Sequence, residues 1–377
     1  MKHRKALLAI IGVVAVAIVG WLIYRAYVPP REEVIKIGAI LPLTGAAAEF
    51  GHYNLQTTRL AIEEFEKKYS LSIRLYVEDS KSSPKEAVSA YRKMTSLDEG
   101  IQIISCELSS VCMAIAPMVE RDGRFMMAIA ATPRLNEFPN ILRIYPIATV
   151  EAAAFAEAIA KLGSQRILSK VVILYINDEF GVSTAEATQS ELSNLGIKEI
   201  RKESYASGSD IRSIVLKHRD CDAVVLVGYG KEMGLIIREF RNYNKTALII
   251  ASPEIAFVDP LSLIALPDPN LFYLDLPDPK PEIVSLYRRR LARSPNLVDL
   301  LVWDGVHILV SSALSIRGQG KSVDTQAIRS RIAGTRFDLS VGPTQVDNSG
   351  NVLYRLTLRD SKTLEALLTN FRSSNVR

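Results

Sequence analysis

The sequence is poor in the residues that most often bind metals. It contains only three cysteines and four histidines among 377 residues, and no two cysteines form a CxxC pair. Zinc sites in proteins are usually built from such pairs and from histidines. The sequence therefore predicts no metal site.

Motifs of several other function classes are absent as well. The formal net charge is +5, but no long basic run follows residue 5, so nucleic acid is not an expected partner. The glycines of "GAILPLTGAAAEFG" have the wrong spacing for a dinucleotide fingerprint. The chain has neither a nucleophile elbow nor a glycine-rich phosphate loop. We therefore expect a protein that is not an enzyme and that needs no cofactor.

The three cysteines are Cys106, Cys112 and Cys221. In an exported protein an odd number leaves at least one thiol free or in an intermolecular bond. Cys106 and Cys112 are close enough in sequence to pair, but small buried thiols are common in protein cores. We expect unpaired, packed thiols at both positions.

The N-terminus has the features of a membrane anchor. Residues 1–5, "MKHRK", are basic, and no charged residue occurs from Ala6 to Tyr24. That length is roughly enough to cross a bilayer as a helix, and interfacial aromatics follow at its far end. We predict a cytoplasmic stub over residues 1–5, an uncleaved anchor over 6–27 and a linker over 28–34, with the rest extracytoplasmic. A cleaved signal peptide is the alternative.

The rest of the chain alternates between strand and helix patterns. Strands are predicted over 34–41, 71–78, 101–105, 125–130, 171–176, 223–227, 247–251, 271–275 and 352–358. Helices are predicted over 54–69, 84–97, 109–121, 151–162, 183–195, 210–218, 231–243, 282–291, 300–316 and 325–332. This order is typical of parallel sheets covered by helices. We predict an α/β protein with two doubly wound parallel-sheet lobes, which bind a small ligand in the cleft between them.

Chemically useful groups follow two strands of the predicted first lobe. Ser109 and Ser110 can cap the helix that begins there, and a helix N-terminus attracts carboxylates. Ala130, Ala131 and Thr132 end the next strand without a large side chain, so a ligand can approach the Ala130 carbonyl and the Thr132 amide and hydroxyl. Taken singly, these residues are also explained by an ordinary cap and an ordinary turn.

The predicted second lobe adds an acid and aromatic rings. Tyr229 and Glu254 follow its strands, and Phe50 and Phe180 lie beside glycines in loops, one in each lobe. Each of these alone could be a packed or solvated loop residue. Together with the first lobe they offer donors for a carboxylate, an acceptor for an ammonium group and walls for a side chain. A free amino acid requires that combination.

Six stretches in this order resemble a known family. They are "IKIGAILPLTGAAAEFG", "SSPKEAV", "AIAATPRL", "NDEFG", "DAVVLVGYGKEMG" and "ASPE". The chain from Ile35 to Leu358 is similar to the periplasmic leucine/isoleucine/valine-type binding proteins of ABC transporters, which have the type I periplasmic-binding fold.

The resemblance implies two lobes joined by a three-stranded hinge. Lobe one would comprise residues 35–146 and 277–341, and lobe two residues 147–276 and 342–377. The crossings would lie near 145–149, 274–279 and 340–343. The chain would capture a ligand, as an expected monomer, and deliver it to an ABC permease. A sensor working with a separate signalling partner is the alternative, as is an amide, urea-like or small carboxylate ligand.

The resemblance also implies roles for particular residues. Ser109 would bind the ligand carboxylate, and Ala130 and Thr132 would hold both the carboxylate and the ammonium through their backbone and the threonine hydroxyl. Tyr229 would reach the carboxylate when the lobes close, and Glu254 would pair with the ammonium. Phe50 and Phe180 stand where the family often has tyrosine.

The chain departs from the family pattern beside these positions. A disulfide found in some members is not expected, because its two places read "DSKS" and Leu108. Glu107 stands where a small or apolar residue is common, and Arg134 follows the threonine motif. If Glu107 faces the pocket, it favours a polar or cationic ligand side chain over an aliphatic one. If it pairs with Arg134 at the rim, it carries no information on specificity.

Overall fold

A computed structural model describes Gly20 and residues 34–69, 71–164 and 168–374. The predicted stub over 1–5 lies outside the described residues, as do the anchor over 6–27 and the linker over 28–34 except for Gly20 and Val34. Within the described part of the chain, the helix α11 (Leu297–Gly318) alone is long and apolar enough to span a membrane. Most of its residues are buried inside the molecule, as in the core helix of a globular protein.

The first sheet is fully parallel, with the strand order β2-β1-β3-β4-β5. Its strands are β1 (Ile35–Leu41), β2 (Ile73–Asp79), β3 (Ile103–Glu107), β4 (Phe125–Ile129) and β5 (Ile141–Arg143). Every residue of β3 and β4 is buried, as expected for central strands with helices on both faces. The sequence did not predict β5, because three residues are too few to show a period.

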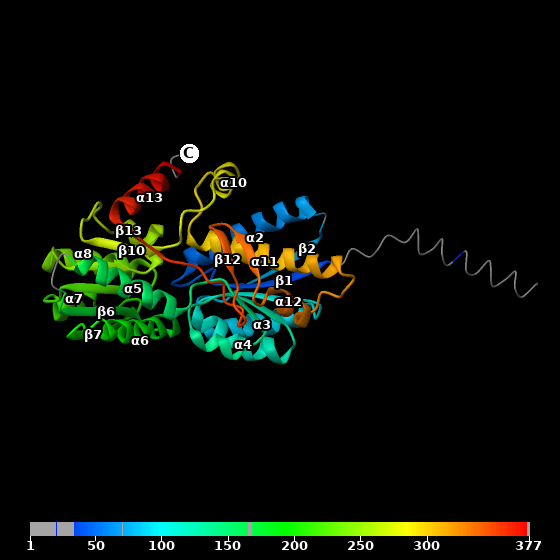
Figure 1. Ribbon diagram of the computed structural model, residues 1–377, viewed down its shortest axis with the longest axis horizontal. Helices are drawn as coiled ribbons and strands as arrows, with labels where there is room; N and C mark the ends of the chain where they lie inside the picture. Colours follow the sequence, from blue (N-terminus) through cyan, green and yellow to red (C-terminus); the bar gives the residue numbers. More distant parts are fainter. Residues whose placement is uncertain (1–19, 21–33, 70, 165–167, 375–377) are drawn as a thin grey trace, which may run out of the picture.

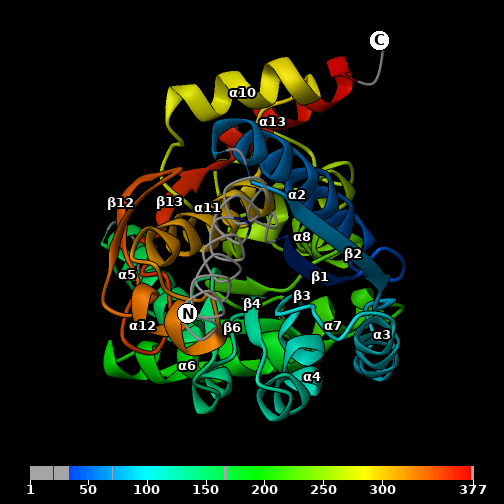
Figure 2. The same cartoon turned by 90° about the vertical axis from the view of Figure 1, so that its right-hand side faces the viewer.

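Helices cover both faces of this sheet. They are α2 (Ala48–Tyr69), α3 (Pro84–Leu97), α4 (Ser109–Arg121) and α11. Figures 1 and 2 show α3 and α4 on one face and α2 with α11 on the other, in agreement with the α3–α4 and α2–α11 contacts. We call this sheet and its helices lobe 1; it also carries α12 (Thr325–Ile332), which packs on α11.

The second sheet has the order β13-β10-β9-β8-β6-β7, and only the β13–β10 pair is antiparallel. Its strands are β6 (Lys170–Ile176), β7 (Glu199–Tyr205), β8 (Ala223–Val227), β9 (Leu248–Ala251), β10 (Leu271–Asp275) and β13 (Thr357–Asp360). The strand β7 was not predicted. It is an edge strand rich in charged residues, "EIRKESY", so its hydrophobic pattern is weak.

The helices that cover the second sheet pack in pairs, α5 with α6 and α7 with α8. Their bounds are α5 (Ala148–Gly163), α6 (Glu179–Asn194), α7 (Ile211–His218), α8 (Lys231–Tyr243) and α9 (Val258–Leu261). We call this sheet and its helices lobe 2. Four helices were predicted at their observed bounds, namely 84–97, 109–121, 231–243 and 325–332. Two short 3₁₀ helices, η1 (Pro133–Glu137) and η2 (Pro253–Ala256), follow β4 and β9 and were not predicted.

The chain passes between the lobes near two of the expected positions, between β5 and α5 and between β10 and α10 (Pro281–Leu291). The third crossing lies later than the predicted 340–343. A hairpin of β11 (Arg336–Leu339) and β12 (Gly342–Gln345) comes first, and Val352 N–H then donates to the Arg143 carbonyl of β5. The Tyr354 hydroxyl also donates to Asp304 of α11. Residues 342–354 therefore lie against lobe 1, and only β13 and α13 (Ser361–Ser374) join lobe 2.

The expectation of unpaired thiols in lobe 1 was wrong. Cys106 at the end of β3 and Cys112 in α4 form a disulfide, with their Cα atoms 5.6 Å apart. The strand-to-helix turn folds the chain back on itself, and this brings two cysteines six residues apart into bonding distance. Cys221 is a buried free thiol.

Candidate functional site

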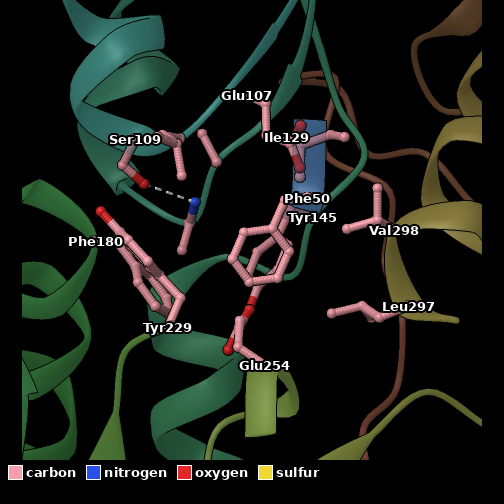
Figure 3. Close-up of a pocket in the computed structure, with 13 residues that line it drawn as sticks. Phe50, Glu107, Ser109, Ile129, Tyr145, Phe180, Tyr229, Glu254, Leu297 and Val298 are labelled. Atoms are coloured by element: carbon pink, nitrogen blue, oxygen red, sulfur yellow. Dashed lines mark hydrogen bonds between the residues drawn. The ribbon is translucent and has the colours of Figure 1, made fainter. Parts of the chain in front are cut away.

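The candidate site is a cavity of about 430 Å³ between the two lobes, including the space at its mouth. Most of its walls follow the carboxyl ends of strands, where open parallel sheets bind ligands. Figure 3 draws the thirteen residues that line it. They are Phe50, Glu107, Leu108, Ser109, Ile129, Ala130, Ala131, Tyr145, Phe180, Tyr229, Glu254, Leu297 and Val298.

The structure brings together most of the residues that the sequence placed in the site. Seven of the eight predicted ligand contacts line the cavity, and so do Glu107 and Leu108. Thr132 does not: its hydroxyl donates to Glu179 Oε1 of α6 over 2.7 Å. Arg134 is also elsewhere, because its guanidinium is exposed and forms an ion pair with Glu179.

The lobe 1 side of the cavity is made by the start of α4 and the end of β4. Leu108, with a φ of 76°, occupies the cap position, and Ser109 is the first residue of the helix. The expected serine cap is therefore absent. Instead, the Ser109 hydroxyl oxygen accepts the Ala131 N–H over 3.1 Å, which leaves its own proton available to a ligand (Figure 3). Together with the positive end of the α4 dipole, this wall favours an anionic group.

The lobe 2 side holds two buried carboxyl groups joined by one tyrosine. The Tyr145 hydroxyl lies 2.6 Å from Glu254 Oε1 and 2.9 Å from Glu151 Oε1, and Thr184 donates to the other Glu151 oxygen. A tyrosine hydroxyl has one proton, so it can donate to only one of these carboxyl groups and must accept a proton from the other. Glu254 lines the cavity, and its Oε2 is a buried oxygen without a partner among the described residues.

The electrostatics assign the two carboxyl groups different states. Burial, followed by the charge of Glu254, raises the pKa of Glu151 well above its ordinary value. Burial also raises the pKa of Glu254, and hydrogen bonds oppose the rise at both acids, so the charge of Glu254 is what gives Glu151 the stronger rise. We therefore assign the proton to Glu151, which donates to Tyr145, while Tyr145 donates to Glu254. Glu254 is then the carboxylate that can accept a cationic group from a ligand.

Tyr229 lines the cavity with its ring, but its hydroxyl already has a partner. It donates to Asp178 Oδ2 over 2.7 Å, and Asp178 also caps α6 by accepting the Gly181 N–H. The ring of Phe180 is stacked on that of Tyr229, with centroids 6.5 Å apart. In this arrangement Tyr229 acts as an aromatic wall, and it can donate to a ligand carboxylate only after leaving Asp178.

Phe50 closes the cavity from lobe 1 by packing on aromatic rings of lobe 2. Its ring is edge-on to Phe257 at 4.4 Å and to Tyr229 at 5.9 Å between centroids. Such edge-to-face pairs are favourable beyond the area that they bury. Phe50 therefore contributes to contact between the lobes as well as to the cavity wall.

Glu107 faces the cavity and does not pair with Arg134. Its side chain, at the end of β3, is almost fully buried, and its Oε2 accepts a hydrogen bond from Asn54 Nδ2 of α2 over 3.2 Å. Burial raises the pKa of Glu107 to about 8, because the Asn54 hydrogen bond opposes it only in part. Of the two alternatives left open by the sequence, the structure has the one in which Glu107 belongs to the pocket.

The two lobes also touch outside the cavity. Glu179 of α6 accepts from Thr132 and pairs with Arg134, both in lobe 1. Glu49 at the start of α2 accepts the backbone N–H groups of Val258 and Asp259 over 2.9 and 3.2 Å. The cleft is therefore closed over the cavity.

Four lining residues were missed from the sequence. Ile129, Leu297 and Val298 are apolar residues of β4 and α11, with no feature that separates them from core positions. Tyr145 lies in the first predicted hinge crossing, directly after "ILRI". A tyrosine between two predicted lobes was a usable signal, because a polar hydroxyl at a lobe boundary needs a buried partner.

Comparison with known proteins agrees with this geometry. A periplasmic binding protein family matches residues 34–355. A Leu/Ile/Val-binding protein of Rhizobium johnstonii is 27% identical over 235 residues, which are 60% of this chain and 63% of that protein. The chain thus matches less than two thirds of that relative's length. A Leu/Ile/Val/Thr-binding protein of Salmonella typhimurium is 24% identical over 84% of this chain and 88% of its own length.

The fold is shared with solved structures as well. A leucine-binding protein from Thermotoga maritima superposes with a TM-score of 0.77 at 22% identity, covering 86% of this chain and 95% of its own. Because the family match covers most of the chain, the parallel-sheet lobes and the cleft between them are those of a solute-binding protein. The chain belongs to the periplasmic binding protein family, and the relatives that it resembles include Leu/Ile/Val/Thr-binding and leucine-binding proteins.

Proposed function

We propose that this protein captures an α-amino acid outside the cytoplasm and delivers it to an ABC importer. The observation that carries the proposal is the pairing of opposite chemistries across one closed cavity. Ser109 and the start of α4 offer donors on the lobe 1 side, and Glu254 offers a buried carboxylate oxygen without a partner on the lobe 2 side. Relatives that are named as amino-acid-binding proteins support the same ligand class.

In this proposal the ligand carboxylate lies against the Ser109 hydroxyl and the first N–H groups of α4. The ligand ammonium lies between the Ala130 carbonyl and Glu254. Lobe 2 contributes Glu254 and Tyr229 only when the cleft is closed, so the ligand binds the closed form more tightly and shifts the equilibrium toward it.

We place lobe 1 at about residues 35–146 and 277–354 and lobe 2 at about 147–276 and 357–374, on the basis of the strand pairing.

Calorimetric titration of the purified full-length protein with all common amino acids tests this proposal. We expect at least one amino acid to bind, and Glu254→Gln to weaken its binding about 100-fold, because the ammonium then loses a buried anionic partner. Glu157→Gln, on the exposed face of α5, serves as the matched control and should bind as the wild type does. Equal affinity of the Glu254→Gln variant would remove Glu254 from the site, and no binding of any amino acid would refute the ligand class.

We further propose that residues 6–27 tether the protein to the membrane. The uncharged stretch and its basic flank support this proposal. Mass spectrometry of the protein from membranes should then find a chain that begins at its own N-terminus, and removal of residues 1–27 should release the binding domain. A mature chain that begins after the apolar stretch would instead identify a cleaved signal peptide.

A further inference from the structure

Glu107 introduces a second carboxyl group into the cavity, and the amino-acid backbone of the proposed ligand does not account for it. Figure 3 draws Glu107 and Glu254 at opposite edges of the lining residues. Glu254 has the Tyr145 hydroxyl and the ligand ammonium as partners. Glu107 lies beside apolar lining residues, including Ile129, its register partner on β4. Its carboxyl group is therefore available to the part of the ligand that distinguishes one amino acid from another.

The hydrogen bonds around Glu107 hold one of its two carboxyl oxygens. Thr58 Oγ1 donates to Asn54 Oδ1 over 3.1 Å, so the amide of Asn54 presents its Nδ2 to Glu107 Oε2. Among the described residues, Asn54 is the one hydrogen-bond partner that we find for this carboxyl group. No hydrogen bond from the described residues reaches the remaining oxygen, Oε1, and Glu107 lines the cavity.

An aliphatic ligand side chain is a poor match for that oxygen. A buried polar group that is covered by hydrocarbon loses its bond to water and gains nothing in return. The described residues of the lining include no lysine, arginine or histidine, so no protein cation can neutralise Glu107. An N–H donor on the ligand satisfies it in either protonation state, because an ionised and a protonated carboxyl group can both accept.

We infer that Glu107 selects amino acids whose side chain ends in an N–H donor, a carboxamide or a cationic group, over branched aliphatic ones. The inference rests on the proposed function, because it names the side chain of the same amino-acid ligand. The carboxamide and the cation share the donor chemistry, and they differ in whether Glu107 must be ionised. Burial among apolar groups, which raises the pKa of Glu107 to about 8, keeps the cost of either state small near neutral pH.

The test is to rank the affinities of leucine, isoleucine, valine, asparagine, glutamine, lysine and arginine for three full-length proteins by calorimetry. These are the wild type, Glu107→Leu and Glu107→Gln, with Glu157→Leu as a control for the gain of an exposed leucine. We expect the wild type to prefer an N–H-bearing side chain. Glu107→Leu should weaken that ligand about tenfold or more and tighten leucine, because the unsatisfied oxygen is gone.

Glu107→Gln distinguishes a carboxamide ligand from a cationic one. It also tests the inference if the Glu107→Leu variant does not fold. A neutral amide at this position retains an acceptor, so a carboxamide ligand should lose only a few-fold in affinity, whereas a cationic ligand should lose tenfold or more. A wild type that prefers leucine, isoleucine or valine, with the same ranking in the variants, would overturn the inference and leave the proposed function intact. Binding of no amino acid to any of the proteins would overturn both.

Discussion

A single hydroxyl group, that of Tyr145, forms hydrogen bonds with two buried acids of the site. Tyr145 lies in the first crossing between the lobes, while Glu151 and Glu254 come from α5 and η2 of lobe 2. Its proton can satisfy only one of them, so the arrangement requires a second proton on the other acid. The tyrosine thus links a protonated Glu151 to an ionised Glu254, which is the acid that lines the cavity.

Tyr145→Phe is expected to weaken ligand binding about tenfold and to lower the free energy of unfolding by about 1–2 kcal/mol. The substitution leaves one oxygen of each acid without this partner, and Glu254 then ionises less readily. Calorimetry and denaturant unfolding measure the two effects. Tyr91→Phe is the matched control, because it removes a tyrosine–carboxyl hydrogen bond to Asp122, away from the cavity. If both variants bind the ligand equally well, Tyr145 has only a structural role.

The sequence was informative about the site wherever a residue follows a strand. Ala130, Tyr229 and Glu254 were placed by that rule, because the carboxyl ends of parallel strands meet at one edge. The rule predicts where a side chain lies, but it does not predict which group that side chain bonds to. The Thr132 hydroxyl was therefore assigned to the ligand although it donates to Glu179, and only the folded chain shows that Glu107 bonds Asn54, which is 53 residues away.

At the scale of elements, the turn between β3 and α4 combines strain and a covalent link. Leu108 has a positive φ, which is costly for a residue with a side chain by about 1–3 kcal/mol. The Cys106–Cys112 disulfide spans the turn and encloses Glu107, Leu108 and Ser109, all of which line the cavity. The disulfide therefore joins the two ends of a strained segment that forms part of the cavity wall.

Replacement of both Cys106 and Cys112 by alanine should weaken ligand binding several-fold. It should also lower the free energy of unfolding by about 2 kcal/mol, because a disulfide that closes so short a loop restricts the unfolded chain by about that much. Denaturant unfolding and calorimetry of the oxidised protein provide the comparison. Cys221→Ala is the control, since it removes a buried thiol of lobe 2 that has no disulfide. Unchanged affinity in the double variant would show that packing alone orients Ser109.

Elements with a strong pattern were predicted well, and those that depend on tertiary contacts were not. The strand "AVVLV" of β8 and the helix α8 were found at their observed bounds, because buried runs and amphipathic periods are local properties. The hairpin of β11 and β12 was not predicted, and the strand predicted over 352–358 begins only at Thr357. Residues up to Tyr354 are held against lobe 1 by Arg143 and Asp304, which no local pattern reveals.

At the scale of the whole molecule, the contacts between the lobes decide how readily the cleft closes. Glu49 of lobe 1 is one of them, because both of its oxygens accept backbone N–H groups from the start of α9 in lobe 2. Burial raises the pKa of Glu49 to about 7 in this closed form; the two backbone hydrogen bonds lower it, and the charge of Asp259 adds to the rise. When the lobes separate, Glu49 meets water and its pKa should return toward 4.5.

The closed form therefore binds the proton of Glu49 more tightly than the open form does. Closure takes up a proton between these two pKa values, so Glu49 favours closure most at pH 4.5 and below and loses that contribution as pH rises to about 7. Because the ligand binds the closed form, ligand affinity should fall roughly 40-fold from pH 5 to pH 7 through this residue. Glu107, whose pKa is raised to about 8, also begins to ionise as the pH approaches 7, so the wild-type profile alone does not isolate Glu49.

Comparison of the wild type with Glu49→Gln isolates it. The glutamine has nearly the same shape but no charge to titrate, so the ratio of the two affinities should change with pH while the contributions of Glu107 and the ligand cancel. Calorimetry at pH 5, 6 and 7 measures this ratio, and Glu63→Gln on the exposed face of α2 is the control. We expect the ligand affinity of the wild type, relative to that of Glu49→Gln, to fall as the pH rises. Only the wild type has a carboxyl group at this position that loses its proton. Parallel pH profiles for the wild type and Glu49→Gln would mean that Glu49 keeps the same environment when the lobes open, and that closure of the cleft does not depend on its contact with α9.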